Sequence, residues 1–164
     1  MPSFNPLRTL LLAYLQSVPD GTVSRYEAMT NINLFFSRID KPYSPGAIYH
    51  ETGKLEHERM IEIKRDKIQV SDASLNWLQN QLTTSPLPGS ILGKLTFLVA
   101  ASLLADKRAR QSAMKRLEID MININPNDAV NASSLGGVEL ATSICLSNLL
   151  LATKRSVLEI GAQY

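Results

Sequence analysis

Apolar residues recur at helical spacing near the start of the chain. Asn5 and Pro6 supply a helix cap and a first-turn proline, and leucines then follow every three or four positions. The turn-forming residues 18–21 end this segment, and Ser24 can cap a second helix. The residues that we expect to face inward from the second helix are Tyr26, Met29, Ile32 and Phe36.

A third helix and a hairpin follow. Ser44 and Pro45 predict a sharp helix start, and we expect this helix to continue to about Arg59. Its inner face is predicted to carry Ile48, Thr52 and Leu55. Residues 61–64 and 67–70 then alternate apolar with polar side chains around a two-residue turn, which is typical of a short β-hairpin.

Ser71 is predicted to cap a fourth helix, which carries Leu75, Trp77, Leu78 and Leu82. Three helices, a short hairpin and a helix follow one another in the order of a winged helix-turn-helix. The predicted fold class is therefore mainly α, with a winged helix-turn-helix followed by a C-terminal helical hairpin.

The second half of the chain contains two long helical patterns. Residues 83–90, which include Pro86 and Pro88, are predicted to link them to the first domain at residues 1–82. One helix should span residues 91 to about 123, and another about 135–160, after a turn at 125–128. The apolar surface of residues 91–164 exceeds what two isolated helices can bury, so a second copy of the chain is expected to cover it.

Composition changes this picture only a little. The chain has 164 residues, of which 45% are hydrophobic, and a formal net charge of +2. The single cysteine, Cys145, cannot close an intrachain disulfide, and the N-terminus lacks a signal-peptide pattern, so a cytoplasmic location is expected. With so little net charge, an argument for nucleic-acid binding has to be local.

The predicted third helix has an outer face suited to contact with bases. Gly46, His50, Gly53 and His57 fall together on this face, flanked by Tyr49 and Lys54. Base edges require hydrogen-bonding groups, and the DNA backbone requires close approach. Because a glycine inside a helix costs about 1 kcal/mol relative to alanine, Gly53 favours close approach. The alternative is an ordinary solvated helix face.

Basic residues gather at the predicted hairpin turn, where they can neutralise phosphate or enter a minor groove. They are Lys64, Arg65 and Lys67. Lysine at a strand edge also protects against aggregation, so this cluster has a second interpretation.

These segments together resemble the PadR-like family of bacterial winged-helix regulators. The motifs are SPGAIYH at positions 44–50, KLEHERMI at 54–61, RYEA at 25–28 and VSD at 70–72, and the similarity covers about residues 6–82. The resemblance implies that Ser44, Pro45 and Tyr49 approach phosphates, that His50 and Lys54 face the groove, and that residues 64–67 form the wing.

The resemblance further implies binding to operator DNA as a homodimer, and it allows a small-molecule effector, to which the sequence assigns no pocket. Three features depart from the family pattern. Arg59 stands where a glycine usually ends the recognition helix, the wing is short and lacks a glycine turn, and Gly53 replaces a larger residue.

Other chemistry finds little support in the sequence. His50 and His57 are seven positions apart, whereas metal-binding pairs on helices use three or four, so no metal or cofactor is predicted. No nucleophile, base and orienting group can be assembled, and no catalytic residue is predicted. The basic run at residues 107–116 is interpreted as a solvated helix face.

The sequence thus predicts a sequence-specific transcriptional regulator that binds a palindromic operator as a homodimer. The alternative is a winged-helix interaction module that has lost DNA binding. Residues 1–82 contain nine basic and nine acidic side chains, which favours that alternative.

Overall fold

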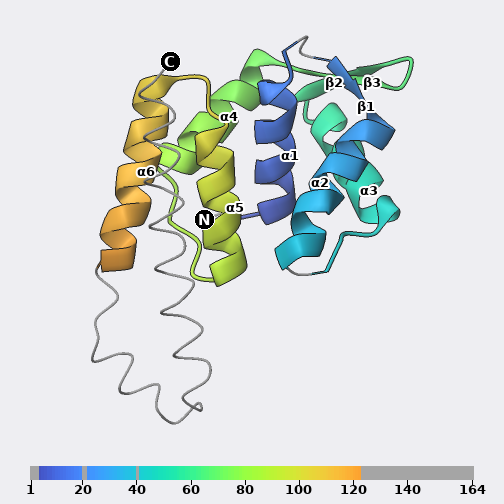
Figure 1. Cartoon of the computed structure of the whole chain (residues 1–164). Helices are drawn as coiled ribbons and strands as arrows, with labels where there is room; N and C mark the ends of the chain where they lie inside the picture. The colour runs from blue at the N-terminus through green and yellow to red at the C-terminus, as the bar shows by residue number, and fades with distance from the viewer. Residues whose placement is uncertain (1–3, 20–21, 40, 123–164) are drawn as a thin grey trace.

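The computed structural model describes residues 4–19, 22–39 and 41–122. Its elements follow the order α1 (Pro6–Ser17), β1 (Thr22–Ser24), α2 (Arg25–Ile39), α3 (Pro45–His57), β2 (Ile61–Lys64), β3 (Lys67–Val70), α4 (Asp72–Thr83), α5 (Ile91–Ser102) and α6 (Lys107–Ile122). Figure 1 shows α2, α3 and the strands on one side of α1, and α5 and α6 on the other. The predicted mainly α winged-helix fold is confirmed.

The caps predicted for the first three helices are present. The Asn5 side chain accepts a hydrogen bond from the Arg8 backbone N–H at 3.1 Å, and Ser24 Oγ accepts one from Glu27 N–H at 3.1 Å. Ser44 Oγ accepts from Ala47 N–H, also at 3.1 Å. Each side chain satisfies a backbone donor in the first helical turn.

The wing is a three-stranded antiparallel sheet in the order β1-β3-β2. The predicted hairpin pairs β2 with β3, and Val23 of β1 lies opposite Ile68 on the other side of β3. β1 was not predicted, because three residues are too few to show an alternating pattern. This strand ties the wing to the start of α2.

Helix α3 ends in a left-handed turn at Arg59, which has φ = 58°. Met60 N–H donates to Leu55 O at 2.8 Å and Arg59 N–H to Glu56 O at 2.9 Å, the two hydrogen bonds of a Schellman motif. The helix ends at His57, two residues before the predicted end at about Arg59. Arginine adopts the left-handed turn for which glycine is usual.

Ser71 has a different role from the one predicted. Its side chain makes no capping hydrogen bond to α4. The hydroxyl instead donates to the backbone oxygens of Arg59 and Met60, at 2.9 and 2.8 Å. These contacts hold the left-handed turn against the end of β3.

The hydrophobic core is built around α1. Seven of its residues are buried, and the helix packs against α2, α3 and α4 as well as α5. In α2, Ile32 and Phe36 are buried as predicted and Met29 is partly buried. Tyr26 was predicted to face inward, but it is 67% exposed. The second position of α2 therefore faces solvent.

The predicted single helix at residues 91–123 is wrong. It is interrupted after Ser102, and α6 begins at Lys107 with Asp106 Oδ1 accepting from Ala109 N–H at 2.8 Å. Lys94 near the start of α5 pairs with Asp120 near the end of α6, with Nζ and Oδ2 2.6 Å apart. The two helices therefore run antiparallel.

The basic residues of α6 do not form a uniformly solvated face. Arg116 is part-buried and donates to the backbone oxygen of Leu82 at 2.7 Å and to that of Ser85. Burial lowers the pKa of its guanidinium. This side chain was assigned to a solvated run, but it satisfies carbonyls at the C-terminal end of α4.

No helix in the part of the chain that the structure describes is long and apolar enough to span a membrane. The predicted turn at 125–128, the helix at about 135–160 and Cys145 lie outside the described residues.

Candidate nucleic-acid interface

The outer face of α3 carries an open hollow, which is lined by Tyr49, His50, Gly53, Lys54, His57 and Glu58. Four of the predicted site residues, Tyr49, His50, Gly53 and Lys54, are thus brought together. Tyr49 is 41% exposed, although it is a large aromatic residue. Opposite this hollow, Ile48, Thr52 and Leu55 are buried as predicted, so the rotation of α3 about its axis is fixed by its apolar side.

Gly53 has no side chain to fill the middle of this helix face. A Cβ atom built at Gly53 would have no heavy atom within 4 Å. Packing within the chain therefore does not require a glycine here. The missing side chain lowers the surface between His50 and His57.

The N-terminus of α3 is exposed, and both Ser44 and Pro45 lie on the surface. Pro45 occupies the first turn, and Ser44 Oγ accepts the hydrogen bond from Ala47 N–H, so the Ser44 hydroxyl proton points elsewhere. Backbone N–H groups at a helix N-terminus attract anions. This end of α3 can therefore receive a phosphate.

The start of α3 is held by α2. The Asn33 side-chain amide donates to Tyr43 O at 2.9 Å, and its Oδ1 accepts from Tyr43 N–H at 3.0 Å. The Tyr43 ring packs edge-on against Phe36 with centroids 4.8 Å apart. Asn33 was missed by the sequence analysis, because a polar residue within a helix gives no sign of a partner ten positions away.

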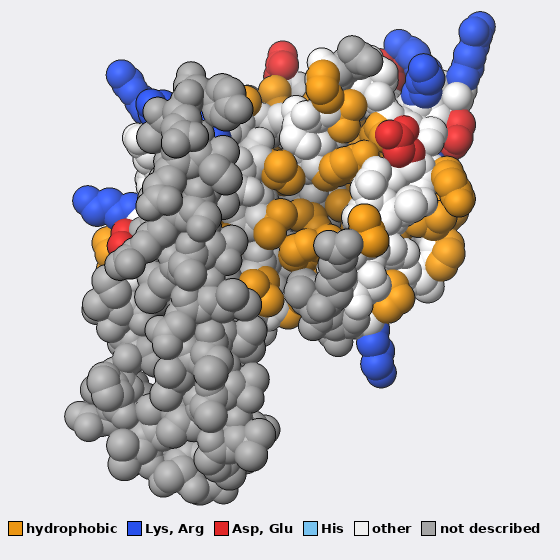
Figure 2. Space-filling model, viewed as in Figure 1, with side chains coloured by type: hydrophobic (Ala, Val, Ile, Leu, Met, Phe, Trp, Pro, Cys, Tyr) orange, Lys and Arg blue, Asp and Glu red, His pale blue; other side chains and the backbone are white. Residues whose placement is uncertain are grey.

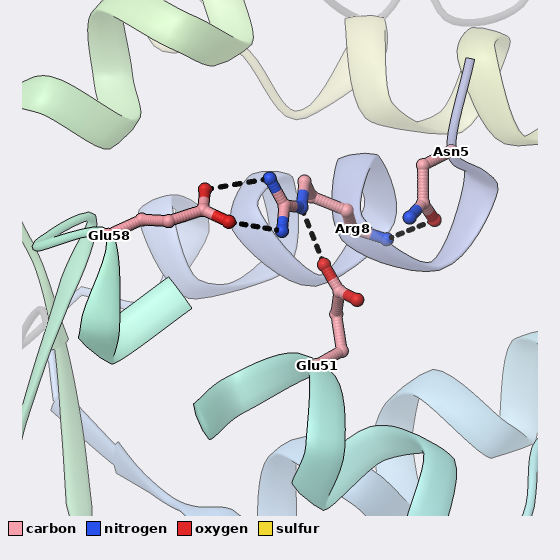
Figure 3. A network of polar contacts seen from close by, with 4 residues as sticks. All are labelled: Asn5, Arg8, Glu51 and Glu58. Carbon is pink, nitrogen blue, oxygen red and sulfur yellow. Dashed lines mark hydrogen bonds and ion pairs between the residues drawn. The ribbon is translucent and has the colours of Figure 1, made fainter. Parts of the chain in front are cut away.

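The far end of α3 is held by α1. Arg8 Nη1 and Nη2 donate to the two carboxylate oxygens of Glu58, at 2.9 and 3.1 Å, and Arg8 Nε donates to Glu51 Oε1 (Figure 3). Burial by itself would lower the pKa of Arg8, but the hydrogen bonds and charges of Glu58 and Glu51 raise the pKa above its ordinary value. This arginine therefore stays charged between two carboxylates.

The wing cations form a separate patch. Lys64, Arg65 and Lys67 are all exposed, and none of them lines the hollow on α3. Arg65 and Asp66 make the turn, with φ values of 49° and 66°. Such a two-residue turn with both φ values positive fits the twist of a hairpin and does not require glycine. The short wing is thus well formed without the glycine that its sequence lacks.

Asp66 also connects the wing to α2. Its backbone oxygen accepts from Arg25 N–H at 3.1 Å, and its carboxylate lies 3.8 Å from Arg25 Nε. Lys64 forms an exposed ion pair with Glu62 at 2.8 Å. Figure 2 shows basic side chains projecting from the edge of the molecule that carries the strands in Figure 1.

Within the described residues, no group of three or more His, Cys, Asp or Glu side chains could hold a metal ion. His50 and His57 share the hollow with a single carboxylate, that of Glu58. Because Glu58 is already engaged by Arg8 through both oxygens, the hollow offers hydrogen-bond donors more than a set of metal ligands.

A scan against protein-family models and a search of curated proteins found no match. Two solved structures align with most of the chain, those of Bacillus subtilis PadR and of the same protein in complex with p-coumaric acid. Each of the two structures is 17% identical to this chain, with a TM-score of 0.42. The alignment with PadR alone covers 95% of this chain and 98% of the PadR chain. The alignment with the p-coumaric acid complex covers 93% of this chain and 97% of the PadR chain.

Proposed function

We propose that the chain is a sequence-specific DNA-binding transcriptional regulator and that α3 is its recognition helix. The observation that carries this proposal is the outer face of α3, where His50 and Lys54 stand exposed beside a glycine that the fold does not need. Lysine donates to guanine O6 and N7 in a major groove, and a low surface lets the helix approach the base edges. In this role the chain acts by binding and not as an enzyme.

Contacts to phosphate would set the orientation of this helix. Ser44, Pro45 and Tyr49 lie at or near the N-terminus of α3, where the helix dipole and exposed N–H groups favour an anion. Lys64, Arg65 and Lys67 on the wing would contact a second stretch of the backbone. Such contacts carry no sequence information, and they set the register of the groove contacts.

We further propose that the regulator works as a cytoplasmic homodimer on a palindromic operator. Two recognition helices related by twofold symmetry contact half-sites about one helical turn apart, which raises affinity without new contacts. Residues 83–90 link the DNA-binding domain, residues 1–82, to the dimerising domain, residues 91–164. A small-molecule effector is compatible with this role, and we assign no binding residues to it.

A protein-interaction module is the second candidate. Its support is the balance of nine basic and nine acidic residues over positions 1–82, together with two large apolar side chains on the surface of α2. These are Tyr26 and Leu34, which are 67% and 52% exposed. A protein partner could cover them, whereas a regulator would leave them in water.

Selection from a pool of random duplex DNA distinguishes the two candidates. The full chain is immobilised, bound duplexes are amplified and sequenced, and sedimentation at micromolar concentration reports its oligomeric state. Enrichment of one palindrome by a dimeric protein supports the proposal. Recovery of no sequence above background after repeated rounds would overturn it in favour of the interaction module.

A further inference from the structure

Arg8 joins two carboxylates that belong to the recognition helix and its C-cap. Glu51 lies in α3 and is buried, whereas Glu58 is the C-cap that follows the last helical residue, His57. The Arg8 side chain is only 15% exposed, and its Cζ lies over the ring of Trp77 of α4, 5.8 Å from the ring centroid. The guanidinium group thus contacts Glu51, Glu58 and the Trp77 ring at the same time.

This contact complements the one at the other end of α3. Asn33 of α2 fixes the residue before the N-cap, while Arg8 of α1 fixes the second turn and the C-cap. Glu51 and Glu58 are seven positions apart, or about two helical turns, so the hydrogen bonds of the one Arg8 guanidinium group span much of the length of α3. The direction of the α3 axis relative to α1 is thereby set at two separate points.

We propose that Arg8 is a positioning residue for DNA recognition: by donating to Glu51 and Glu58 it sets the angle at which α3 meets the groove. The inference rests on the proposed function. Arg8 does not itself line the hollow and contacts its lining only at Glu58, the C-cap of α3, so it acts on the side chains of His50 and Lys54 through the helix. An error of about one ångström in the position of base-contacting side chains suffices to lose their bidentate hydrogen bonds.

The geometry favours positioning over stability alone. Apolar residues of similar volume often replace a buried ion pair with no loss of stability, because they avoid the desolvation of two charges. Apolar contacts have no preferred direction, whereas the planar guanidinium fixes both distance and angle. Removing the hydrogen bonds from Arg8 to Glu51 and Glu58 can therefore leave the protein folded and still change how α3 is held.

Three variants separate these effects in the full chain. Arg8→Lys keeps the positive charge and loses the planar guanidinium group that donates to both carboxylates. Arg8→Met combined with Glu51→Leu removes the charge pair without leaving Glu51 buried and unpaired. The matched control is Lys94→Met combined with Asp120→Leu, since Lys94 is buried to a similar degree, 13% exposed, and its pair joins α5 to α6 without touching α3.

Two measurements decide the outcome. Hydrogen exchange of residues 45–58 should be faster in both Arg8 variants than in wild type, and unchanged in the Lys94 control. On the selected operator, the ratio of specific to random-sequence affinity should fall about tenfold or more, equivalent to the loss of roughly one base pair's worth of discrimination. The urea midpoint of the Arg8–Glu51 double variant should stay close to that of the control.

Each result has a distinct meaning. An unchanged exchange rate in α3 would overturn the positioning role, whether or not the chain binds DNA. An unchanged affinity ratio on an operator that wild type selects would overturn it as well. If wild type selects no operator, the proposed function fails, and the exchange measurement still decides whether Arg8 holds α3.

Discussion

Lys64 and Lys67 lie directly opposite each other across β2 and β3, one residue on either side of the wing turn. Like charges placed opposite each other on a sheet destabilise the pair. Glu62 neutralises only one of them, through an exposed ion pair with Lys64. The stability of the fold therefore gives no reason for two lysines at these positions. A DNA phosphate bound between them would neutralise both charges.

Lys67→Ala should leave the free energy of unfolding unchanged or raise it by a few tenths of a kcal/mol, because it removes the like-charge pair. The same variant should weaken binding to all DNA sequences and lower the slope of log K against log salt by about one. Titrations at several salt concentrations measure this slope. Glu62→Gln, which removes a negative charge from the neighbouring strand β2, serves as the control and should strengthen binding. A slope equal to that of wild type would exclude the Lys67 contact.

Lys54→Ala and His50→Ala should act on sequence preference. Both side chains are exposed on the hollow of α3, so their removal should leave stability within about 0.5 kcal/mol of wild type. If they contact base edges, each should weaken binding to the selected operator by about 1 to 3 kcal/mol and binding to random DNA much less. Parallel gel-shift titrations with both duplexes test this. Equal losses on the two duplexes would contradict contact with bases.

Gly53→Ala should stabilise the fold and weaken DNA binding. The added methyl group meets no heavy atom within 4 Å, and alanine is favoured over glycine inside a helix by about 1 kcal/mol. Urea denaturation measures the gain, and operator titration measures the loss caused by the methyl group at the interface.

Gly93→Ala is the matched control for Gly53. Gly93 is also a glycine within a helix, but a Cβ atom there would lie 2.5 Å from Pro88 Cβ, so this variant should lose stability. Unchanged operator affinity in Gly53→Ala would show that the DNA does not approach α3 at this point.

Arg59→Gly should stabilise the protein. A non-glycine residue in the left-handed conformation costs about 1 kcal/mol, and glycine adopts it without steric penalty. We expect a gain of about 0.5 to 1 kcal/mol in the free energy of unfolding, measured by urea denaturation. Arg59→Ala keeps the penalty and should show no such gain. Loss of stability in the glycine variant would mean that the arginine side chain makes contacts that outweigh its backbone cost.

The sequence predicted the winged helix because its helix starts carry local signals. Asn5, Ser24 and Ser44 each cap within three residues of their own position, so that the sequence alone shows both the donor and the acceptor. The residues on the outer face of α3 were predicted for the same reason, since residues of one helix face are related by a fixed period.

The contacts that orient α3 could not be predicted in this way. Arg8 lies 43 positions from Glu51 and 50 from Glu58 in the sequence, and nothing in the local pattern links them. The break between α5 and α6 was also missed, because no proline or glycine marks it. Asp106 gave the only signal, a residue type that is favoured at N-caps, and it was overlooked within a long apolar segment.

The three-stranded wing sheet has a consequence for the entropy of binding. Because β1 precedes α2 directly and pairs with β3, and because Arg25 N–H donates to Asp66 O, the wing tip and the start of α2 move as one rigid unit. A wing attached by a single hairpin would have to be ordered by the DNA, at a cost of about 1 to 2 kcal/mol for each residue whose backbone is fixed. Here the backbone is already ordered before any ligand arrives. Despite its small size, this wing can present its cations to a second surface at a fixed distance from α2, and only their side-chain tips remain to be immobilised.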